Sequence, residues 1–113
     1  MRNLKVETRE AGKVRILDVH GELRFGETGA LEEAVKSLIE EDHANLVINM
    51  EGVPWLDTGG INALLMCKRW AAKKGGDVKL LKLSNQVWKV LVIAYLHRNF
   101  DIFDDELKAV GSF

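Results

Sequence analysis

The strongest constraint on the fold is a short, nearly continuous apolar run, Leu46 to Met50, interrupted only by Asn49. A strand with one solvated face alternates apolar and polar side chains, whereas a run of this kind is typical of a strand covered on both faces. Such strands occur in sheets that carry helices. The run therefore predicts a central strand and an α/β fold.

The chain before this strand predicts a hairpin and a helix. Apolar residues alternate from Asn3 to Thr8 and again from Val14 to Val19, with a break between them that is typical of a β-hairpin turn. Thr28 is placed to cap a helix. The apolar positions with helical spacing that follow it are Leu31, Ala34, Val35, Leu38 and Ile39.

The chain after the central strand repeats the alternation of helix and strand. A helix is predicted from about Ile61 to Lys74, ended by two glycines, and a strand from Val78 to Leu83. Ser84 can cap a third helix, and the extended segment from Phe100 to Phe103 precedes a last helix opened by Asp104, Asp105 and Glu106.

This order of elements predicts the architecture. Two strands followed by alternating helices and strands indicate a mixed sheet of four to five strands with about four α-helices packed on it. A chain of 113 residues has the size of one ordinary domain. We therefore expect residues 1–113 to form a single domain.

Charge and targeting signals narrow the partners and the location. Sixteen Lys and Arg against seventeen Asp and Glu leave a net charge of -1, which does not favour nucleic acid as a partner. The N-terminus is charged, and no apolar run is long enough to cross a bilayer. We expect a cytoplasmic protein without direct membrane insertion.

Catalytic and metal-binding patterns are lacking in the sequence. One cysteine and three scattered histidines offer neither a disulfide nor a usual metal site, and no phosphate loop or dinucleotide fingerprint is present. Cys67 lies mid-helix among apolar residues, where a buried, inert thiol is expected. We expect no cofactor, no metal and no enzyme activity.

The most informative segment is the loop and helix start from Val53 to Ile61. Asp57 or Thr58 can cap the helix, and Gly59 and Gly60 allow a tight backbone. The loop residues Val53, Pro54 and Trp55 lie where aromatic side chains tend to serve contacts. On general frequencies alone, a purely structural role remains an adequate interpretation of this segment.

Three motifs in this order carry a resemblance to a known family. Gly21-Glu22-Leu23 ends the second strand, and Leu56 to Ile61 opens a helix. Phe100 to Glu106 forms an extended segment and the start of the terminal helix. Over nearly its whole length the chain resembles the STAS domain, the sulphate-transporter and anti-sigma-factor-antagonist family. The resemblance implies a STAS-like fold and a stand-alone bacterial anti-sigma factor antagonist.

The resemblance also implies a phosphorylation switch. In stand-alone members, the residue after the Asp that matches Asp57 is phosphorylated by an anti-sigma factor that is itself a Ser/Thr kinase. Here that residue is Thr58, with Asp57, Gly59 and Gly60 supporting it. The unphosphorylated domain would bind the kinase and free the sigma factor, and a PP2C-type phosphatase would restore that state. A monomer or weak homodimer is expected.

The expected contact surface is the loop before this helix. Phosphate on Thr58 would add about -1.5 to -2 charges beside Val53, Pro54 and Trp55 and would disrupt docking. Met66 and Trp70, on a second apolar face of the helix, would extend this surface or pack under the third helix.

Two positions depart from the family pattern. Arg24 stands where an Asp is common, near the expected partner surface, which predicts altered specificity. Gly59 stands where a Ser or Thr is frequent, which leaves one hydroxyl at the site.

Two alternatives stay open beside the antagonist. The Asp57-Thr58-Gly59-Gly60 variant also looks like the STAS subunit of lipid-transport ABC complexes, which docks on an ATPase without a phosphorylation switch. A scaffold role in a stressosome-type complex is the other alternative.

Overall fold

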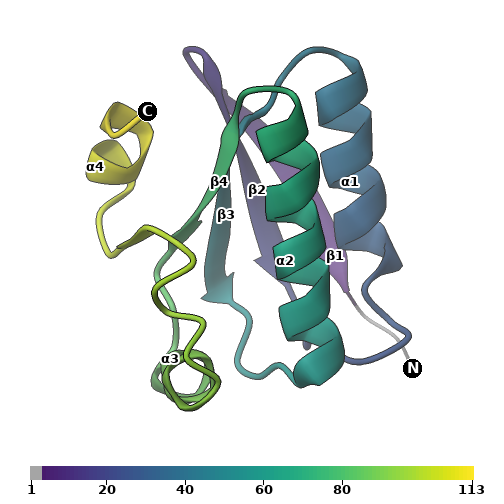
Figure 1. The fold of residues 1–113 in the computed structure, drawn as a ribbon, viewed down its shortest axis with the longest axis vertical. Helices are drawn as coiled ribbons and strands as arrows, with labels where there is room; N and C mark the ends of the chain where they lie inside the picture. Colours follow the sequence, from purple (N-terminus) through teal and green to yellow (C-terminus); the bar gives the residue numbers. More distant parts are fainter. Residues whose placement is uncertain (1–3) are drawn as a thin grey trace.

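The computed structural model describes residues 4–113 and contains one five-stranded sheet in the order β1-β2-β3-β4-β5 (Figure 1). The first pair is antiparallel and all other pairs are parallel. The strands are β1 (Lys5–Ala11), β2 (Val14–His20), β3 (Asn45–Gly52), β4 (Asp77–Leu81) and β5 (Ile102–Phe103).

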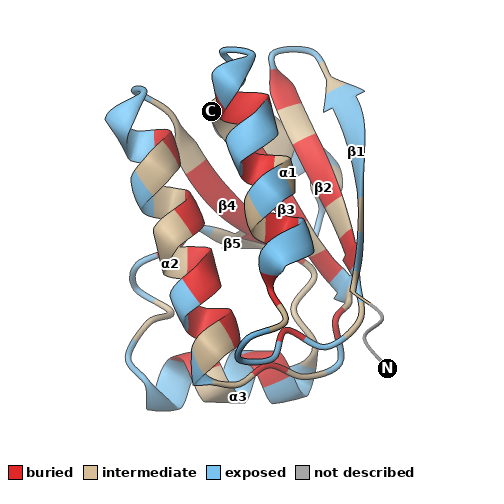
Figure 2. Ribbon diagram, turned by 90° about the vertical axis from the view of Figure 1, so that its right-hand side faces the viewer, coloured by how far each residue is buried: buried red, intermediate tan, exposed pale blue. Residues whose placement is uncertain are grey.

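Four helices surround this sheet, and the predicted mixed α/β fold is confirmed. They are α1 (Gly29–Glu40), α2 (Thr58–Lys73), α3 (Asn85–Ile93) and α4 (Glu106–Gly111). Helices α1 and α2 lie side by side over one face of the sheet, and α4 lies on the other face (Figure 1). Helix α3 lies at the end of the molecule where α2 begins (Figures 1 and 2).

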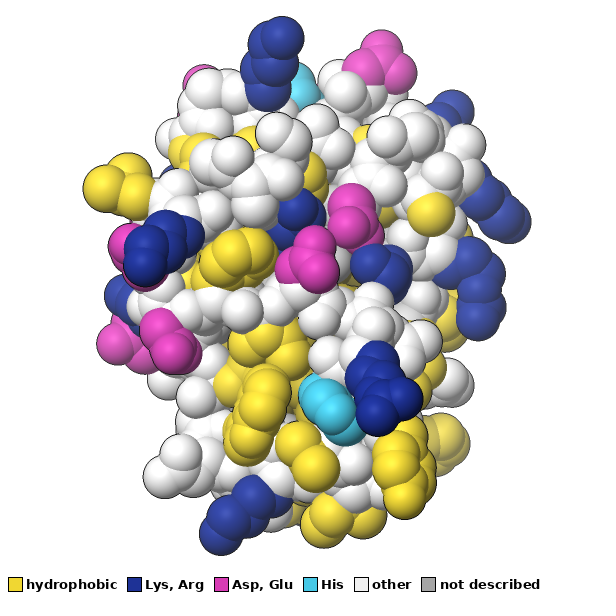
Figure 3. Space-filling view, turned by 60° about the vertical axis from the view of Figure 1, so that its left-hand side comes forward, with side chains coloured by type: hydrophobic (Ala, Val, Ile, Leu, Met, Phe, Trp, Pro, Cys, Tyr) yellow, Lys and Arg dark blue, Asp and Glu magenta, His cyan; other side chains and the backbone are white. Residues whose placement is uncertain are grey.

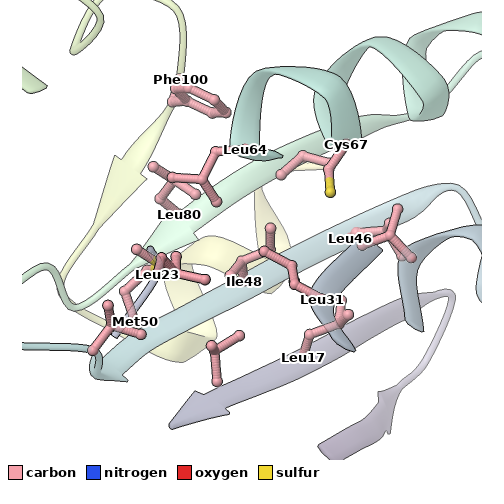
Figure 4. Close-up of a cluster of buried hydrophobic side chains, with 14 of the residues drawn as sticks. Leu17, Leu23, Leu31, Leu46, Ile48, Met50, Leu64, Cys67, Leu80 and Phe100 are labelled. Carbon is pink, nitrogen blue, oxygen red and sulfur yellow. The ribbon is translucent and has the colours of Figure 1, made fainter. Parts of the chain in front are cut away.

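The central strand β3 is covered on both faces, as its sequence predicts. Leu46, Ile48 and Met50 point into the main core beneath α1 and α2 (Figure 4). Val47 points the other way, into a smaller core closed by Ala109 of α4. These four side chains are fully buried, which explains the apolar run, whereas Asn45 and Asn49 on the same face as Val47 are half-buried and Glu51 is exposed.

Several element boundaries differ from the predicted ones. The hairpin is confirmed, but β1 continues to Ala11, which pairs with Val14. The predicted start of this strand at Asn3 lies outside the described residues. Helix α2 begins at Thr58 rather than Ile61 because Asp57 caps it, and it is followed by Gly75 in the left-handed region, as predicted.

The prediction that Thr28 caps α1 with its side chain is wrong. Thr28 occupies the N-cap position, but its side chain makes no capping hydrogen bond. The hydroxyl instead donates to the carboxylate of Glu32 at 2.6 Å, one turn into the helix. Thr28 is 8% exposed, so this buried hydroxyl is satisfied by a side chain rather than by a backbone group.

Candidate functional site

Two loops are joined where the parallel strands β2 and β3 end. The N–H of Gly21 donates to the carbonyl of Gly52 at 3.0 Å, and the N–H of Leu23 donates to that of Trp55 at 3.2 Å. The N–H of Asp57 then donates back to the carbonyl of Leu23 at 3.2 Å. The loop after β2 is therefore bound along its length to the loop that leads into α2.

Asp57 fixes both loops with one carboxylate. Its Oδ1 accepts from the N–H of Gly60 at 3.1 Å, which caps α2, and its Oδ2 accepts from the N–H of Phe25 at 3.0 Å. Desolvation acts to raise the pKa of this carboxyl, but the backbone N–H groups of Phe25, Gly60 and Gly59 outweigh it. The pKa of Asp57 consequently lies below its usual value.

Gly59 and Gly60 allow the loop after β2 to approach α2. A Cβ at Gly59 would overlap the backbone of Phe25, and a Cβ at Gly60 would overlap the carbonyl of Leu23. The glycine found where the family often has Ser or Thr is therefore required by this close approach. This explains the departure at Gly59, which the sequence alone leaves without a reason.

Thr58 is the first residue of α2, and its side chain is exposed. The cap at Asp57 precedes it, and the close-packed Gly59 follows it. Because both neighbours are held by contacts to the loop after β2, the position of Thr58 is set through the backbone. Both carboxylate oxygens of Asp57 are engaged by backbone N–H groups in this arrangement.

The loop residues of the expected contact surface divide into two groups. Val53 is fully buried, so the expectation that it contributes contact surface is wrong: it anchors the loop in the core. Pro54 is exposed and Trp55 is half-buried. The guanidinium of Arg24 lies 5.4 Å from the centre of the Trp55 ring and 3.1 Å from the carboxylate of Glu22.

Met66 lines a groove that also contacts Gly59, the residue after Thr58. The groove has a volume of about 360 Å³ and lies between the loop after β2, the start of α1 and the first half of α2. Phe25, which is 81% exposed, forms its rim together with Gly59. Phe25 was not predicted as a surface contact from the sequence, although an aromatic residue beside Arg24 in a glycine-containing loop is a signal for one.

Trp70 lies one turn beyond Met66 and also faces α1. The ammonium of Lys36, on α1, lies 4.6 Å from the centre of the Trp70 ring. The surrounding pocket of about 260 Å³ is lined by residues of α1 and the end of α2. The alternative that Met66 and Trp70 pack under α3 is therefore wrong, since both line pockets between α1 and α2, and their part in a docking surface stays a prediction.

A comparison with family models gives the identity of this fold. The model of the STAS domain matches residues 5–109. The chain belongs to the STAS domain family. Its element order places Thr58 at the start of the helix that follows the central strand.

Solved structures share the STAS fold over nearly the whole chain. An anti-sigma factor antagonist from Mycobacterium paratuberculosis has a TM-score of 0.84 at 19% identity, covering 97% of this chain and 93% of its own. The anti-sigma factor antagonist SpoIIAA in its unphosphorylated form has a TM-score of 0.78 at 19% identity, covering 96% and 93%. The phosphorylated form of SpoIIAA, a Bacillus cell fate determinant, has a TM-score of 0.71 at 18% identity, covering 96% and 97%. At these identities the likeness concerns the fold.

Three further properties of the described residues in this STAS domain concern the reactivity of its thiol, metal binding and membrane insertion. The Cys67 thiol is buried, and desolvation raises its pKa to about 12, which leaves it unreactive. Among residues 4–113, no three His, Cys, Asp or Glu side chains gather as a metal site would require. No helix in the same stretch has the length and apolar character needed to span a bilayer.

Proposed function

We propose that this STAS domain is an anti-sigma factor antagonist switched by phosphorylation of Thr58. The observation that carries the proposal is the exposed hydroxyl of Thr58 in the first turn of α2, directly after the Asp57 cap. The fold shared with the antagonist SpoIIAA, which has a phosphorylated form, supports it. The domain would bind and release a partner and catalyse nothing itself.

The docking surface would surround Thr58. Exposed Phe25 and Pro54, half-buried Trp55 and the groove beside Met66 offer apolar contact area with few charges. Aromatic and Met side chains of this kind are enriched at protein interfaces. The unphosphorylated surface would bind an anti-sigma factor kinase and thereby free its sigma factor.

Arg24 would set the specificity of this surface. Its guanidinium covers the Trp55 ring and pairs with Glu22, so the kinase would meet a cation on an aromatic side chain. Where the family commonly has Asp, this chain presents the opposite charge. Its cognate partner would accordingly present an acidic or neutral group at this point.

Phosphate on Thr58 would block docking without unfolding the domain. The backbone N–H groups at the start of α2 and the helix dipole favour an anion at this position. Two unit charges about 4 Å apart interact with about 4 kcal/mol at an effective dielectric near 20, and a hundredfold change in affinity is about 2.7 kcal/mol. One phosphate dianion on Thr58 that faces a negative charge of the partner is therefore sufficient to shift the domain from the bound to the free state.

The switch would need two other enzymes. The kinase would supply the ATP and transfer the phosphoryl group to the Thr58 hydroxyl, and a PP2C-type phosphatase would hydrolyse the phosphoester. All three proteins would act together in the cytoplasm. No metal or cofactor would be needed in the STAS domain itself.

The deciding experiment is phosphosite mapping of the protein purified from its native cells, with and without stress. Intact mass and peptide mapping should place one phosphate on Thr58. Absence of phosphate under every condition would contradict the proposal.

Thr58→Glu tests the mechanism separately from its occurrence in cells. This variant should bind the kinase at least tenfold more weakly by calorimetry, while its melting temperature stays near that of the wild type. Thr8→Glu is the matched control, because Thr8 is an exposed threonine on β1. Equal binding by Thr58→Glu and Thr8→Glu would contradict the mechanism.

Gly59 favours a second candidate, a STAS subunit that docks permanently on the ATPase of a lipid-transport ABC complex. The site offers a single hydroxyl, and the loop after β2 packs tightly against Gly59, the residue that follows it. The same surface would then serve as a constant interface. Co-purification with a membrane ATPase, together with an unmodified Thr58, would support this candidate.

A further inference from the structure

Helix α3 leaves a large apolar face uncovered. It is anchored in the core by Val87 and Leu91, which are fully buried. On its outer side Trp88 is 42% exposed and Ile93 is 79% exposed, and Tyr95, just past its end, is 77% exposed. A helix with one buried side normally turns polar side chains to water, so this outer face is unusual.

Helix α3 is followed by an aromatic residue, Tyr95, in an unfavourable backbone conformation. The N–H of Leu96 donates to the carbonyl of Leu91 at 2.8 Å, and the N–H of Tyr95 donates to that of Val92 at 3.0 Å. This is a Schellman motif, in which glycine is the usual left-handed residue. Here Tyr95 holds that position with a φ of 59°. A bulky side chain in this region costs stability, which points to a role outside the fold.

Two cations flank the apolar face. Residues 84–100 include Lys89 and Arg98 but no Asp or Glu, in a chain whose net charge is -1, and Asp104, which lines a pocket together with Trp88, lies at one edge of the face. Both cations are exposed, and neither forms an ion pair within residues 4–113. In Figure 3, apolar side chains gather over the lower part of the molecule, where α3 lies, beside histidine and Lys or Arg, and acidic side chains lie higher on this face.

We propose that this face docks a partner protein through a segment whose apolar side chains are flanked by carboxylates. We call it the α3 surface, made of Trp88, Lys89, Val92, Ile93, Tyr95 and Arg98. The apolar centre would bury the partner's hydrophobic side chains, and the two cations would pair with its acidic ones. The proposal goes beyond the function of Thr58, which lies on α2 and contributes nothing to this surface.

The composition of the α3 surface favours a protein over a membrane. Trp, Tyr and Arg are the residues that dominate the energetics of protein interfaces. Binding to anionic lipid typically relies on clusters of about four to eight cations, whereas two lie here. The surface lies at the same end of the molecule as the start of α2 (Figures 1 and 2).

Photo-crosslinking in the native cells tests the proposal. A benzophenone amino acid replaces Ile93 in the full chain, and the crosslinked protein and peptide are identified by mass spectrometry. Leu107 on α4 is the matched control position, because it is 81% exposed and is followed by Lys108. We expect position 93, and not position 107, to crosslink to a protein segment that combines apolar and acidic residues.

Charge reversal then tests the two cations. Lys89→Glu with Arg98→Glu should reduce the crosslink at position 93 at least tenfold, whereas Lys108→Glu should leave it unchanged. Thermal unfolding must first show that these surface variants are folded. Tyr95→Gly provides a second variant: it should raise the melting temperature, because glycine suits the left-handed position, and still weaken the crosslink.

Several results of these experiments would overturn the proposal. Crosslinks to lipid alone, to a second copy of the chain alone, or to no molecule would overturn the proposal. A protein crosslink that survives charge reversal would overturn the acidic character of the partner and the proposal with it. None of these results depends on the modification state of Thr58.

Discussion

The carboxylate of Asp57 accepts a hydrogen bond of 3.0 Å from the backbone N–H of Phe25, a residue 32 positions earlier in the chain. Its other oxygen caps α2 through Gly60 at 3.1 Å. One side chain therefore joins the loop after β2 to the start of the helix that carries Thr58. The geometry of the candidate switch depends on this double contact.

Asp57→Ala should destabilise the domain by about 2 kcal/mol, the upper part of the range for losing an N-cap, because the bond to Phe25 is lost as well. Asp57→Asn keeps an acceptor oxygen and should cost less. Urea denaturation measures both, with Asp104→Ala as an exposed acidic control. If Asp57→Ala and Asp104→Ala had equal free energies of unfolding, the role of Asp57 in joining the loop after β2 to α2 would be contradicted.

Gly59→Ala should cost about 1–3 kcal/mol, because the added Cβ overlaps the backbone of Phe25 and the loop must move. Gly29→Ala is the control. Gly29 is also at the start of a helix, but its Cβ would enter open space, so this change should stabilise by about 0.5 kcal/mol. Thermal unfolding of the two variants should give shifts of opposite sign.

Arg9 on β1 should give the domain part of its resistance to acid. Its guanidinium donates to Asp18 at 2.6 Å and to Glu106 at 2.9 Å, and these bonds lower the pKa of both carboxyls. Because the folded pKa values lie below the ordinary values of 3.8 and 4.5, the stabilisation is complete above those values and is lost as the pH falls below them.

Arg9→Met should therefore lower stability by about 1 kcal/mol or less near pH 7, since these groups are partly exposed. The difference from wild type should shrink as the pH falls below 3.8, because both carboxyls then become protonated and lose their bonds to Arg9. Arg69→Met is the control at an exposed arginine. A constant difference across the pH range in urea denaturation would refute this account.

Lys79 should be coupled energetically to the end of the chain. Its side chain is 8% exposed, and its Nζ donates to the hydroxyl of Ser112 at 2.8 Å and to its carbonyl at 3.0 Å. Ser112→Ala should cost about 1 kcal/mol more in the wild type than in a Lys79→Met background. A double-mutant cycle with no coupling would show that the hydroxyl contributes nothing to this contact.

The order of elements was predictable because it depends on local patterns. The nearly continuous apolar run of β3, the serine before α3 and the glycine after α2 each act over a few residues, and each prediction is confirmed. Patterns of that range reflect burial on one or two faces and the satisfaction of helix ends, which neighbouring residues decide.

The same local patterns were misleading where contacts come from afar. Val53 stands in a loop yet is fully buried, and Trp70 faces α1 rather than α3. Thr28 stands at the cap position of α1 but donates to Glu32. In each case a neighbour in space, and not the position in the pattern, determines the role of the side chain.

The sequence by itself determined the α/β class, the central strand and the position of Thr58 at a helix start, because periodicity and capping act within a few residues. Only the tertiary structure decided why Gly59 replaces a hydroxyl residue, what the second oxygen of Asp57 binds, and which apolar side chains stay exposed on α3. These features depend on contacts between segments that are tens of residues apart in the sequence, and local sequence patterns do not show which distant segments come into contact.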